Sequence, residues 1–204
     1  MRTPRGALRH PLWPDPLAPV LAGRIVRLEP LTPAHDDDLV EAARPPEIWT
    51  WMCSAMTSDE TRAWLAAARA GSEFPFATVD VSSGRAIGST RYMSLRPEHH
   101  GLEIGWTWLT PAAWRTGANV EAKLLQLTYA FETLRCLRVE LKTHASNARS
   151  RGAMERMGAT FEGIHRKHMV LPGVGVRDSA WYSILDDEWP RVREGLQARL
   201  GCLT

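Results

Sequence analysis

Residues 103–134 read EIGWTWLTPAAWRTGANVEAKLLQLTYAFETL, and this stretch decides the fold of the chain. Beginning at Leu102, apolar side chains alternate with polar or small ones. The apolar positions are Leu102, Ile104, Trp106 and Trp108. This alternation predicts a strand over 102–109, which ends before Pro111 because proline cannot donate to a strand ladder. Further on, apolar residues recur at steps of four and three: Val120, Leu124, Leu127, Phe131 and Leu134. That spacing predicts a helix, so the stretch is a strand, a turn and a helix.

The turn, Trp114-Arg115-Thr116-Gly117-Ala118-Asn119, has the features of an anion site. The first amides of a helix lack intrahelical partners, and the helix dipole adds positive potential there. Gly117 lets the backbone approach a ligand closely and Arg115 adds a full charge, so a phosphate or pyrophosphate is the expected guest. Plain turn geometry is the alternative interpretation. The glycine patterns of a Walker loop and of a dinucleotide fingerprint are both absent.

A second strand and helix follow the first pair. Leu137, Val139 and Leu141 alternate with charged residues, which predicts a strand, and residues 146–150 lead into a short helix that ends at Met157-Gly158. With these residues in view, the sequence resembles the GNAT superfamily of acyl-CoA-dependent N-acyltransferases, in particular its RimJ/RimL-like branch. The resemblance covers Arg24 to Pro190.

Two motifs carry this resemblance. The family's pyrophosphate motif, Q/R-x-x-G-x-G/A, corresponds to residues 114–119. Gly117 matches it, whereas Trp114 replaces the usual Gln or Arg and Asn119 replaces the last Gly or Ala. The second motif, N-x-x-S followed by a helix and a Gly-aromatic exit, matches Asn147, Ser150 and the segment 158–161. The two motifs in this order are fairly specific, and either one alone would not be.

The resemblance implies an α+β fold with a mostly antiparallel seven-stranded sheet flanked by helices. Its strands at 102–109 and 137–142 lie parallel and splay apart, and acetyl-CoA enters the gap as a cosubstrate. The residues implied at the pyrophosphate are those of the turn: Trp114, Arg115, Thr116, Gly117, Ala118 and Asn119. Asn147 would bond the pantetheine amides, and the backbone around Trp108 and Leu109 would donate to the thioester oxygen.

The chemistry of amine acylation points to candidate acids and bases. A thioester is already activated, so the enzyme must present a neutral amine and help the thiolate leave. Glu103 is the candidate base, since the family often uses a carboxylate in this strand; the alternation places it opposite Ile104 and the tryptophans. Glu140 is its rival, although its charged neighbours favour a surface ion-pair face. Ser150 is the candidate acid. The alternatives are a solvated carboxylate for Glu103 and ordinary helix-start roles for Asn147 and Ser150.

Composition narrows the class of protein. The chain has 204 residues, of which 44% are hydrophobic and 24% charged, values typical of one soluble globular domain. A net charge of +2 does not indicate a nucleic-acid partner. Neither the three cysteines nor the histidines have metal-ligand spacing, so we expect no metal site. With no apolar run of membrane-spanning length and no secretory h-region, we expect a cytoplasmic protein.

The remainder of the chain predicts an α+β meander. The Pro-rich segment 1–23 is expected to be an arm, packed or disordered, ahead of one domain over 24–204. Further strands are expected at 24–30, 74–81, 86–95, 160–171 and 176–185, the last two joined by a turn at 172–175. Helices should start at Thr32, at the capping box Thr57-x-x-Glu60, and at Asp186 or Asp187.

The function favoured by the resemblance is transfer of the acetyl group of acetyl-CoA to the N-terminal α-amine of a protein or peptide. One alternative is acetylation of a small amine, such as an amino sugar, polyamine, amino acid or aminoglycoside. Another is a non-catalytic acyl-CoA-binding module, which the altered motif positions Trp114 and Asn119 keep open. In both catalytic cases the Trp-rich segment 49–56 would wall the acceptor site. The sequence does not set the oligomeric state, and a homodimer is one candidate assembly.

Overall fold

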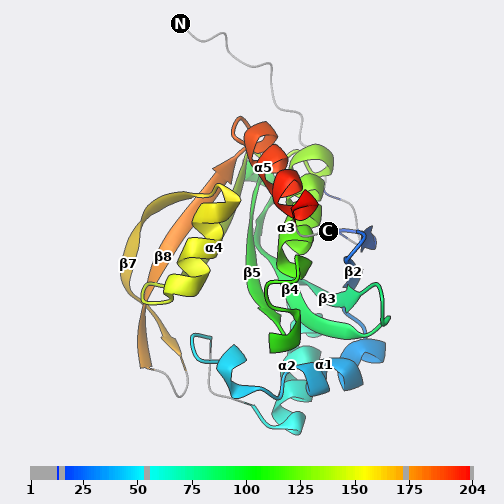
Figure 1. Ribbon diagram of the computed structural model, residues 1–204. Helices are drawn as coiled ribbons and strands as arrows, with labels where there is room; N and C mark the ends of the chain where they lie inside the picture. Colours follow the sequence, from blue (N-terminus) through cyan, green and yellow to red (C-terminus); the bar gives the residue numbers. More distant parts are fainter. Residues whose placement is uncertain (1–12, 14–16, 53–55, 172–174, 203–204) are drawn as a thin grey trace, which may run out of the picture.

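The structure, a computed structural model, describes residues 13, 17–52, 56–171 and 175–202 (Figure 1). Its strands are β1 (Leu21–Ala22), β2 (Val26–Pro30), β3 (Phe74–Asp80), β4 (Ala86–Arg96), β5 (Gly101–Leu109), β6 (Arg138–His144), β7 (Thr160–Leu171) and β8 (Gly175–Leu185). Its α-helices are α1 (Asp36–Ala42), α2 (Ser58–Ala70), α3 (Ala118–Thr128), α4 (Ala148–Met157) and α5 (Trp189–Gly201). Short 3-10 turns lie at Pro33–His35, Pro46–Ile48, Pro97–His99 and Pro111–Ala113, and a π-helical turn (Tyr129–Thr133) extends α3.

The strands form one sheet in the order β1-β2-β3-β4-β5-β6-β8-β7. Within the described residues, β5 and β6 pair in parallel, and every other pair of neighbours is antiparallel. This confirms the α+β class and the mostly antiparallel sheet with a parallel central pair. The seven expected strands are β2 to β8. The two-residue β1 is an eighth, and the Pro-rich arm contributes it.

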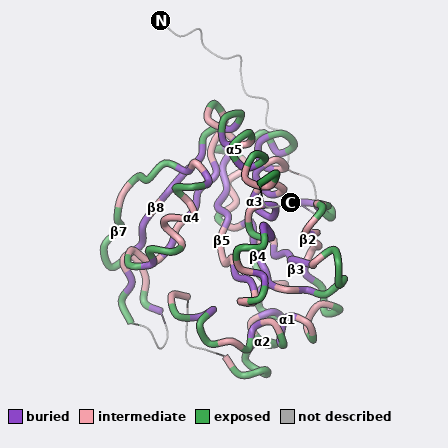
Figure 2. The backbone as a smooth tube through the Cα atoms, in the orientation of Figure 1, coloured by how far each residue is buried: buried purple, intermediate pink, exposed green. Residues whose placement is uncertain are grey.

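Helices cover the two faces of the sheet unequally (Figure 1). Leu102, Ile104 and Val139 point to one side of the sheet, which is here called the α3 face. On that side they join a core with α3 and α5. Helix α4 lies on the same face, where Arg151 Nε donates to the hydroxyl of Tyr182. On the opposite side, the α1 face, α1 and α2 cover β3, β4 and the part of β5 that carries Trp106 and Trp108, and β4 and β5 are largely buried (Figure 2). The α1 face of β6 and β8 is therefore not covered by a helix of the described chain.

The parallel pair splays as expected. Residue pairing of β5 with β6 is limited to Gly101–Arg138, Leu102–Val139 and Glu103–Glu140. Beyond that point β5 continues to Leu109 beside β4, and β6 continues to His144 beside β8. A V-shaped gap in the hydrogen-bonded sheet thus begins immediately after Glu103.

A β-bulge in β5 borders this gap. Ser89 pairs with Trp108 but Arg91 pairs with Gly105, so β5 has one extra residue there, and Trp106 has a φ of 48°. The extra residue shifts the alternation, because successive side chains point to opposite faces. Trp106 and Trp108 therefore lie on the α1 face together with Glu103. The expectation that both tryptophans share a face with Ile104 is wrong, since a bulge is set by cross-strand pairing.

Most predicted helix starts are confirmed. Thr57 and Glu60 form the capping box of α2, and Asn147 caps α4, which ends at Gly158 in the left-handed conformation. Thr32 precedes a 3-10 turn, so α1 begins only at Asp36. The expected cap of the last helix is wrong: Glu188, rather than Asp186 or Asp187, precedes α5, and the early Pro190 suits a first helical turn.

The last part of the N-terminal arm packs on the body. Leu17 and Ala18 are buried, and the hydroxyl of Tyr129 donates to the Leu17 carbonyl at 3.0 Å. Segments 1–12 and 14–16 of the arm lie outside the described residues. So does most of the predicted turn at 172–175, of which only Gly175, at the start of β8, is described.

Candidate active site

The turn before α3 presents free backbone amides. Gly117 is the N-cap of α3 with a φ of 92°, a left-handed conformation that glycine adopts without strain. The amide of Ala118 donates to Thr116 Oγ1 at a long 3.4 Å. Within the described chain, no acceptor is found for the amides of Asn119 and Val120. Such a set of helix-start donors is what a pyrophosphate requires.

Trp114 links this turn to both neighbouring elements. Its indole Nε1 donates to the carbonyl of Leu109 at 2.9 Å, which ties the turn to the end of β5. The guanidinium of Arg149, from the first turn of α4, lies 4.1 Å from the Trp114 ring. The tryptophan that replaces a family Gln or Arg thus holds a cation beside the turn. Arg149 was not among the predicted site residues, although its place two residues after Asn147 was a usable signal.

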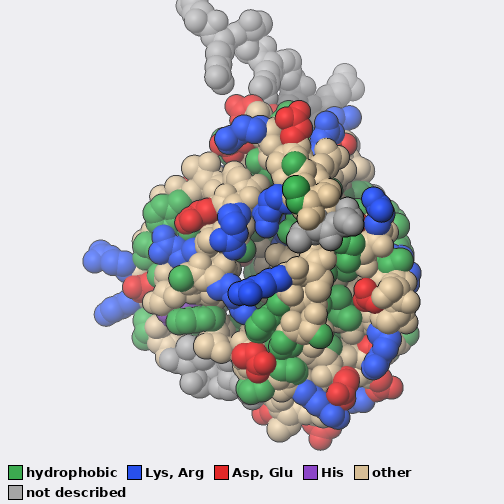
Figure 3. Space-filling model, in the orientation of Figure 1, with side chains coloured by type: hydrophobic (Ala, Val, Ile, Leu, Met, Phe, Trp, Pro, Cys, Tyr) green, Lys and Arg blue, Asp and Glu red, His purple; other side chains and the backbone are tan. Residues whose placement is uncertain are grey.

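Basic side chains gather around the same region. Figure 3 shows Lys and Arg side chains around a hollow between α3 and α4. Arg115 is exposed beside Gly117, and Arg149 is exposed on α4. Positive charge and unpaired amides at one helix start favour a phosphorylated ligand.

The end of β5 offers a backbone donor to the gap. The amide of Thr110 donates to the carbonyl of Ile87 on β4 at 2.8 Å. Because amides alternate in direction along a strand, the Leu109 amide points away from β4 and toward the gap. The Trp108 amide points toward β4 by the same alternation. Of the two backbone positions predicted at the thioester, Leu109 has the available donor.

The start of α4 lies across from this strand end. Asn147 is 9% exposed, and its Oδ1 accepts from the Ser150 amide at 3.0 Å, so the helix-cap interpretation holds. Neither Asn147 Nδ2 nor the Ser150 hydroxyl has a hydrogen bond to a described residue. Both side chains therefore keep a polar group for a ligand while they cap the helix.

Glu103 is the buried carboxylate of the gap. It is 1% exposed and belongs to the last residue pair that joins β5 to β6. Its Oε2 accepts from Lys142 Nζ at 2.7 Å and from Ser94 Oγ at 3.2 Å. Its Oε1 is buried, and no donor of the described residues reaches it. Glu103 is thus not a solvated strand carboxylate, and one of its oxygens remains for a donor.

Glu140, the rival base, has both oxygens engaged. Oε1 accepts from Arg138 Nε at 2.8 Å, and Oε2 lies 2.7 Å from a terminal nitrogen of Arg96. Glu140 thus lies in ion pairs as predicted, but it is buried rather than at the surface. Glu140 lacks the free oxygen that Glu103 has.

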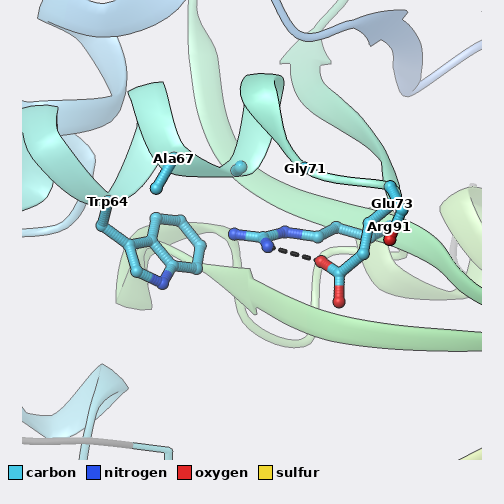
Figure 4. A pocket seen from close by; sticks show the side chains of 7 residues that line it. Trp64, Ala67, Gly71, Glu73 and Arg91 are labelled. Atoms are coloured by element: carbon cyan, nitrogen blue, oxygen red, sulfur yellow. Dashed lines mark hydrogen bonds and ion pairs between the residues drawn. The ribbon is translucent and has the colours of Figure 1, made fainter.

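Aromatic residues wall the α1 face beside Glu103. The rings of Trp106 and Trp64 lie 5.6 Å apart, and those of Trp108 and Trp49 lie 5.4 Å apart. Figure 4 shows Arg91 reaching toward Trp64. The two residues line a hollow of about 280 Å³, and Arg91 Nη1 donates to Glu73 Oε2 at 2.6 Å.

The Trp-rich segment lies at the open end of the gap. Trp51 lies 4.9 Å from the ring of His144, the last residue of β6. Trp51 thus contacts the strand that borders the gap, and a wall of the acceptor site remains a prediction for this segment. Residues 53–55 of that segment are outside the described chain.

The inner side of α3 holds polar groups that the apolar spacing did not predict. Glu121, Lys123 and Gln126 are buried there alongside Leu127. Lys123 Nζ donates to Thr107 Oγ1 at 2.7 Å, to Gln126 Oε1 at 2.9 Å and to Thr90 Oγ1 at 3.0 Å. Burial lowers the pKa of Lys123 to about 7. Since Thr107 adjoins the Trp106 bulge, this amine ties α3 to the bulged part of β5.

The site combines three features: a splayed parallel strand pair, a helix start with free amides, and a buried carboxylate where β5 and β6 diverge. Together they define an acyl-CoA-dependent acyltransferase of the GNAT type. Residues 26–160 match the acetyltransferase (GNAT) domain family, and the chain belongs to that family. Members are N-acetyltransferases that use acetyl-CoA as cosubstrate. Membership in this family of acyl-CoA-dependent N-acetyltransferases favours the catalytic interpretations over a non-catalytic binding module.

Particular relatives place it more closely. "Putative ribosomal N-acetyltransferase YdaF" of Bacillus subtilis is 31% identical over 106 residues, a match that spans 52% of this chain and only 57% of YdaF. A GCN5-related N-acetyltransferase from Brucella melitensis is 36% identical with a TM-score of 0.84, over 93% of this chain and 86% of that one. RimJ of Mycobacterium smegmatis, solved in complex with CoA-disulfide, shares the fold, with a TM-score of 0.72 at 19% identity over 88% of this chain and 91% of that one. The name of YdaF agrees with the RimJ/RimL-like branch.

The helices were also compared with the length of a membrane span. Across the described residues, none is both long and apolar enough to cross a bilayer.

Proposed function

We propose that the enzyme acetylates the α-amine at the N-terminus of a protein or peptide. The observation that carries this proposal is the buried Oε1 of Glu103, which lacks a donor where β5 and β6 diverge. A buried acceptor atom needs a partner, and the N–H of an amine entering from the α1 face supplies one. The name of YdaF, a putative ribosomal N-acetyltransferase, supports a ribosomal protein as the acceptor.

In this proposal each substrate occupies its own side of the sheet. CoA lies along the α3 face, with its pyrophosphate on the amides of Asn119 and Val120. Its pantetheine arm passes through the gap between Leu109 and Asn147. The amine meets the thioester from the α1 face, where Glu103 lies. The two substrates thus approach the reacting carbon from opposite faces of one sheet.

Different residues around the gap carry out the two proton transfers of the reaction, one from the amine and one to the thiolate. As the amine nitrogen attacks the carbonyl carbon, Glu103 accepts a proton from it. The Leu109 amide stabilises the negative oxygen of the tetrahedral intermediate. When the C–S bond breaks, the Ser150 hydroxyl protonates the leaving thiolate.

An acceptor panel tests the proposal. CoA release is followed with peptides that carry a free or an already acetylated N-terminus, and with small amines such as spermidine and glucosamine. We expect turnover only with free α-amines, and mass spectrometry should place the acetyl group on the first residue. Turnover of the small amines alone would contradict the peptide assignment.

Replacing Gly117 with Val should weaken CoA binding at least tenfold, about 1.4 kcal/mol. A β-branched side chain is strained at a φ of 92° and blocks the approach of the pyrophosphate. Calorimetric titration with CoA measures the loss. Gly84→Val is the matched control, because Gly84 has a φ of 71° with nothing within 4 Å of an added Cβ. Unchanged affinity in Gly117→Val with an intact circular dichroism spectrum would contradict the anion site.

Replacing Ser150 with Ala should lower kcat by about 10 to 10²-fold, the low end of general acid catalysis, because a thiolate is a tolerable leaving group. CoA affinity should change little, since the contact forms mainly in the transition state. The cap survives because the Ser150 amide, not its hydroxyl, donates to Asn147. Ser146→Ala, an exposed position before α4, is the control. A lower melting temperature at unchanged kcat would reduce Ser150 to a helix-start residue.

A further inference from the structure

A group of basic side chains beside Glu103 has no part in the proton transfers above. It consists of Lys142, His165, His168 and Arg177, here called the basic cluster. Glu103 of β5 pairs with Glu140 of β6, and Lys142, two residues further along β6, lies on the same α1 face. Lys142 pairs with Trp181 of β8, and Arg177, four residues before Trp181, shares that face by the same alternation. The Trp181 ring lies 5.0 Å from Lys142 Nζ and 4.8 Å from the His165 ring.

Arg177 is a buried cation without an anionic partner. It is 9% exposed, its Nε donates to Ser179 Oγ at 3.0 Å, and it forms no ion pair with a described carboxylate. The adjacent Asp178 accepts instead from the Lys167 amide. Burial lowers the pKa of Arg177, and the charge of Glu103 opposes that effect. A guanidinium stays charged in proteins, and its terminal nitrogens, which form no hydrogen bond to a described residue, remain available to an acceptor.

The charges on this face do not balance. Lys142 is paired with Glu103, which leaves Arg177 in surplus. The pKa of His168 is lowered by burial and by the charge of Lys142, and that of His144 by burial and by the charge of Arg177. Both shifts favour the neutral imidazole, and neither histidine can offset the charge of Arg177. The guanidinium of Arg177 is therefore a positive charge on this face that is not paired with any described carboxylate.

We infer that the basic cluster, through Arg177, binds a carboxylate of the acceptor, so that the preferred peptide has Asp or Glu at its first or second position. This inference rests on the proposed function, because it names the acceptor of the same site. Glu103 faces the amine and Arg177 the carboxylate from one face of the sheet, which matches an acceptor with both charges close together. The planar guanidinium suits a carboxylate, which it can bind through two parallel hydrogen bonds. A basic acceptor is repelled by the same surplus charge.

The test compares peptides that differ only in their second residue: Ser-Glu, Ser-Gln and Ser-Lys followed by one common sequence. Free glutamate is a fourth acceptor that offers the same carboxylate without a peptide. kcat/KM is measured for the wild type, for Arg177→Gln and for Arg166→Gln, which removes an exposed arginine of β7 as a control. We expect the wild type to favour Ser-Glu over Ser-Gln by about tenfold, and Ser-Lys to be the poorest substrate.

The readout is the ratio of kcat/KM for Ser-Glu to kcat/KM for Ser-Gln within one enzyme variant. Partial misfolding lowers both values equally, so it does not change this ratio. Arg177→Gln should bring this ratio close to one, mainly through KM for Ser-Glu, whereas Arg166→Gln should keep it. A wild-type ratio of one or below, or an unchanged ratio in Arg177→Gln, overturns the inference and leaves peptide acetylation intact. Arg177-dependent acetylation of free glutamate without any peptide turnover would support carboxylate binding and overturn the proposed peptide acceptor.

Discussion

The Glu103→Gln enzyme is expected to be at least about 10²-fold slower than the wild type at neutral pH. Glutamine keeps the size of the side chain but cannot accept the proton of the incoming amine. An α-amine has a pKa of roughly 8, so it loses its own proton as the pH rises. The variant should therefore partly recover at alkaline pH. A pH–rate profile of kcat with a peptide acceptor measures both effects.

Glu140→Gln is the matched control for this experiment. Glu140 is a buried carboxylate on the same face, and both of its oxygens lie in ion pairs with Arg96 and Arg138. Its replacement should lower the melting temperature and leave the shape of the profile unchanged. A near-wild-type profile for Glu103→Gln would assign proton transfer to another group. Equal rate losses in Glu103→Gln and Glu140→Gln would indicate that the reaction depends on the negative charge of this face, not on Glu103 as a base.

The second large effect concerns stability and follows from Lys123. Its pKa is about 7 in the folded protein, compared with ~10.4 for an unfolded lysine. Between these values the unfolded chain binds more protons, so this residue makes stability rise with pH, by up to ~1.4 kcal/mol per pH unit. The difference in unfolding free energy between the wild type and Lys123→Met should thus grow by several kcal/mol from about pH 7 to about pH 10.

Denaturant unfolding at several pH values measures this difference, in which all shared titrations cancel. Lys167→Met is the control, because it removes an exposed lysine instead of a buried one. A flat difference curve for Lys123→Met would show that Lys123 keeps an ordinary pKa. The expected slope would mean that β5 is held at its bulge by a neutral amine bonded to Thr90 and Thr107.

Local chemistry made parts of the site predictable from sequence. Gly117 marks the start of α3 because few other residues accept its backbone conformation. Asn147 and Thr57 were predicted as caps because their short polar side chains bond the first amides of a helix. The splay of β5 and β6 came from the family resemblance, not from a residue pattern. Once the strand order is known, the register that ends at Glu103 explains the splay.

The features that sequence could not predict depend on contacts between distant segments. The bulge at Trp106 arises from pairing with β4, and it moves two tryptophans to the face of Glu103. Burial of Lys123 requires Thr90 and Gln126 as partners, which no spacing along α3 reveals. Arg149 contacts Trp114 only because α4 and the α3 turn meet across the gap. Each of these contacts is tertiary, and each adjusts the site rather than the fold.

The central claim is that the α3 turn and the β5–β6 gap hold acetyl-CoA with its thioester open toward Glu103. A crystal structure with CoA and a non-reactive peptide tests it most directly. The account predicts pyrophosphate oxygens within hydrogen-bond distance of the Asn119 and Val120 amides, the sulfur beside Leu109, and the peptide amine bonded to Glu103 Oε1. A pyrophosphate bound away from α3, or an amine that reaches the thioester from the α3 face, would contradict it.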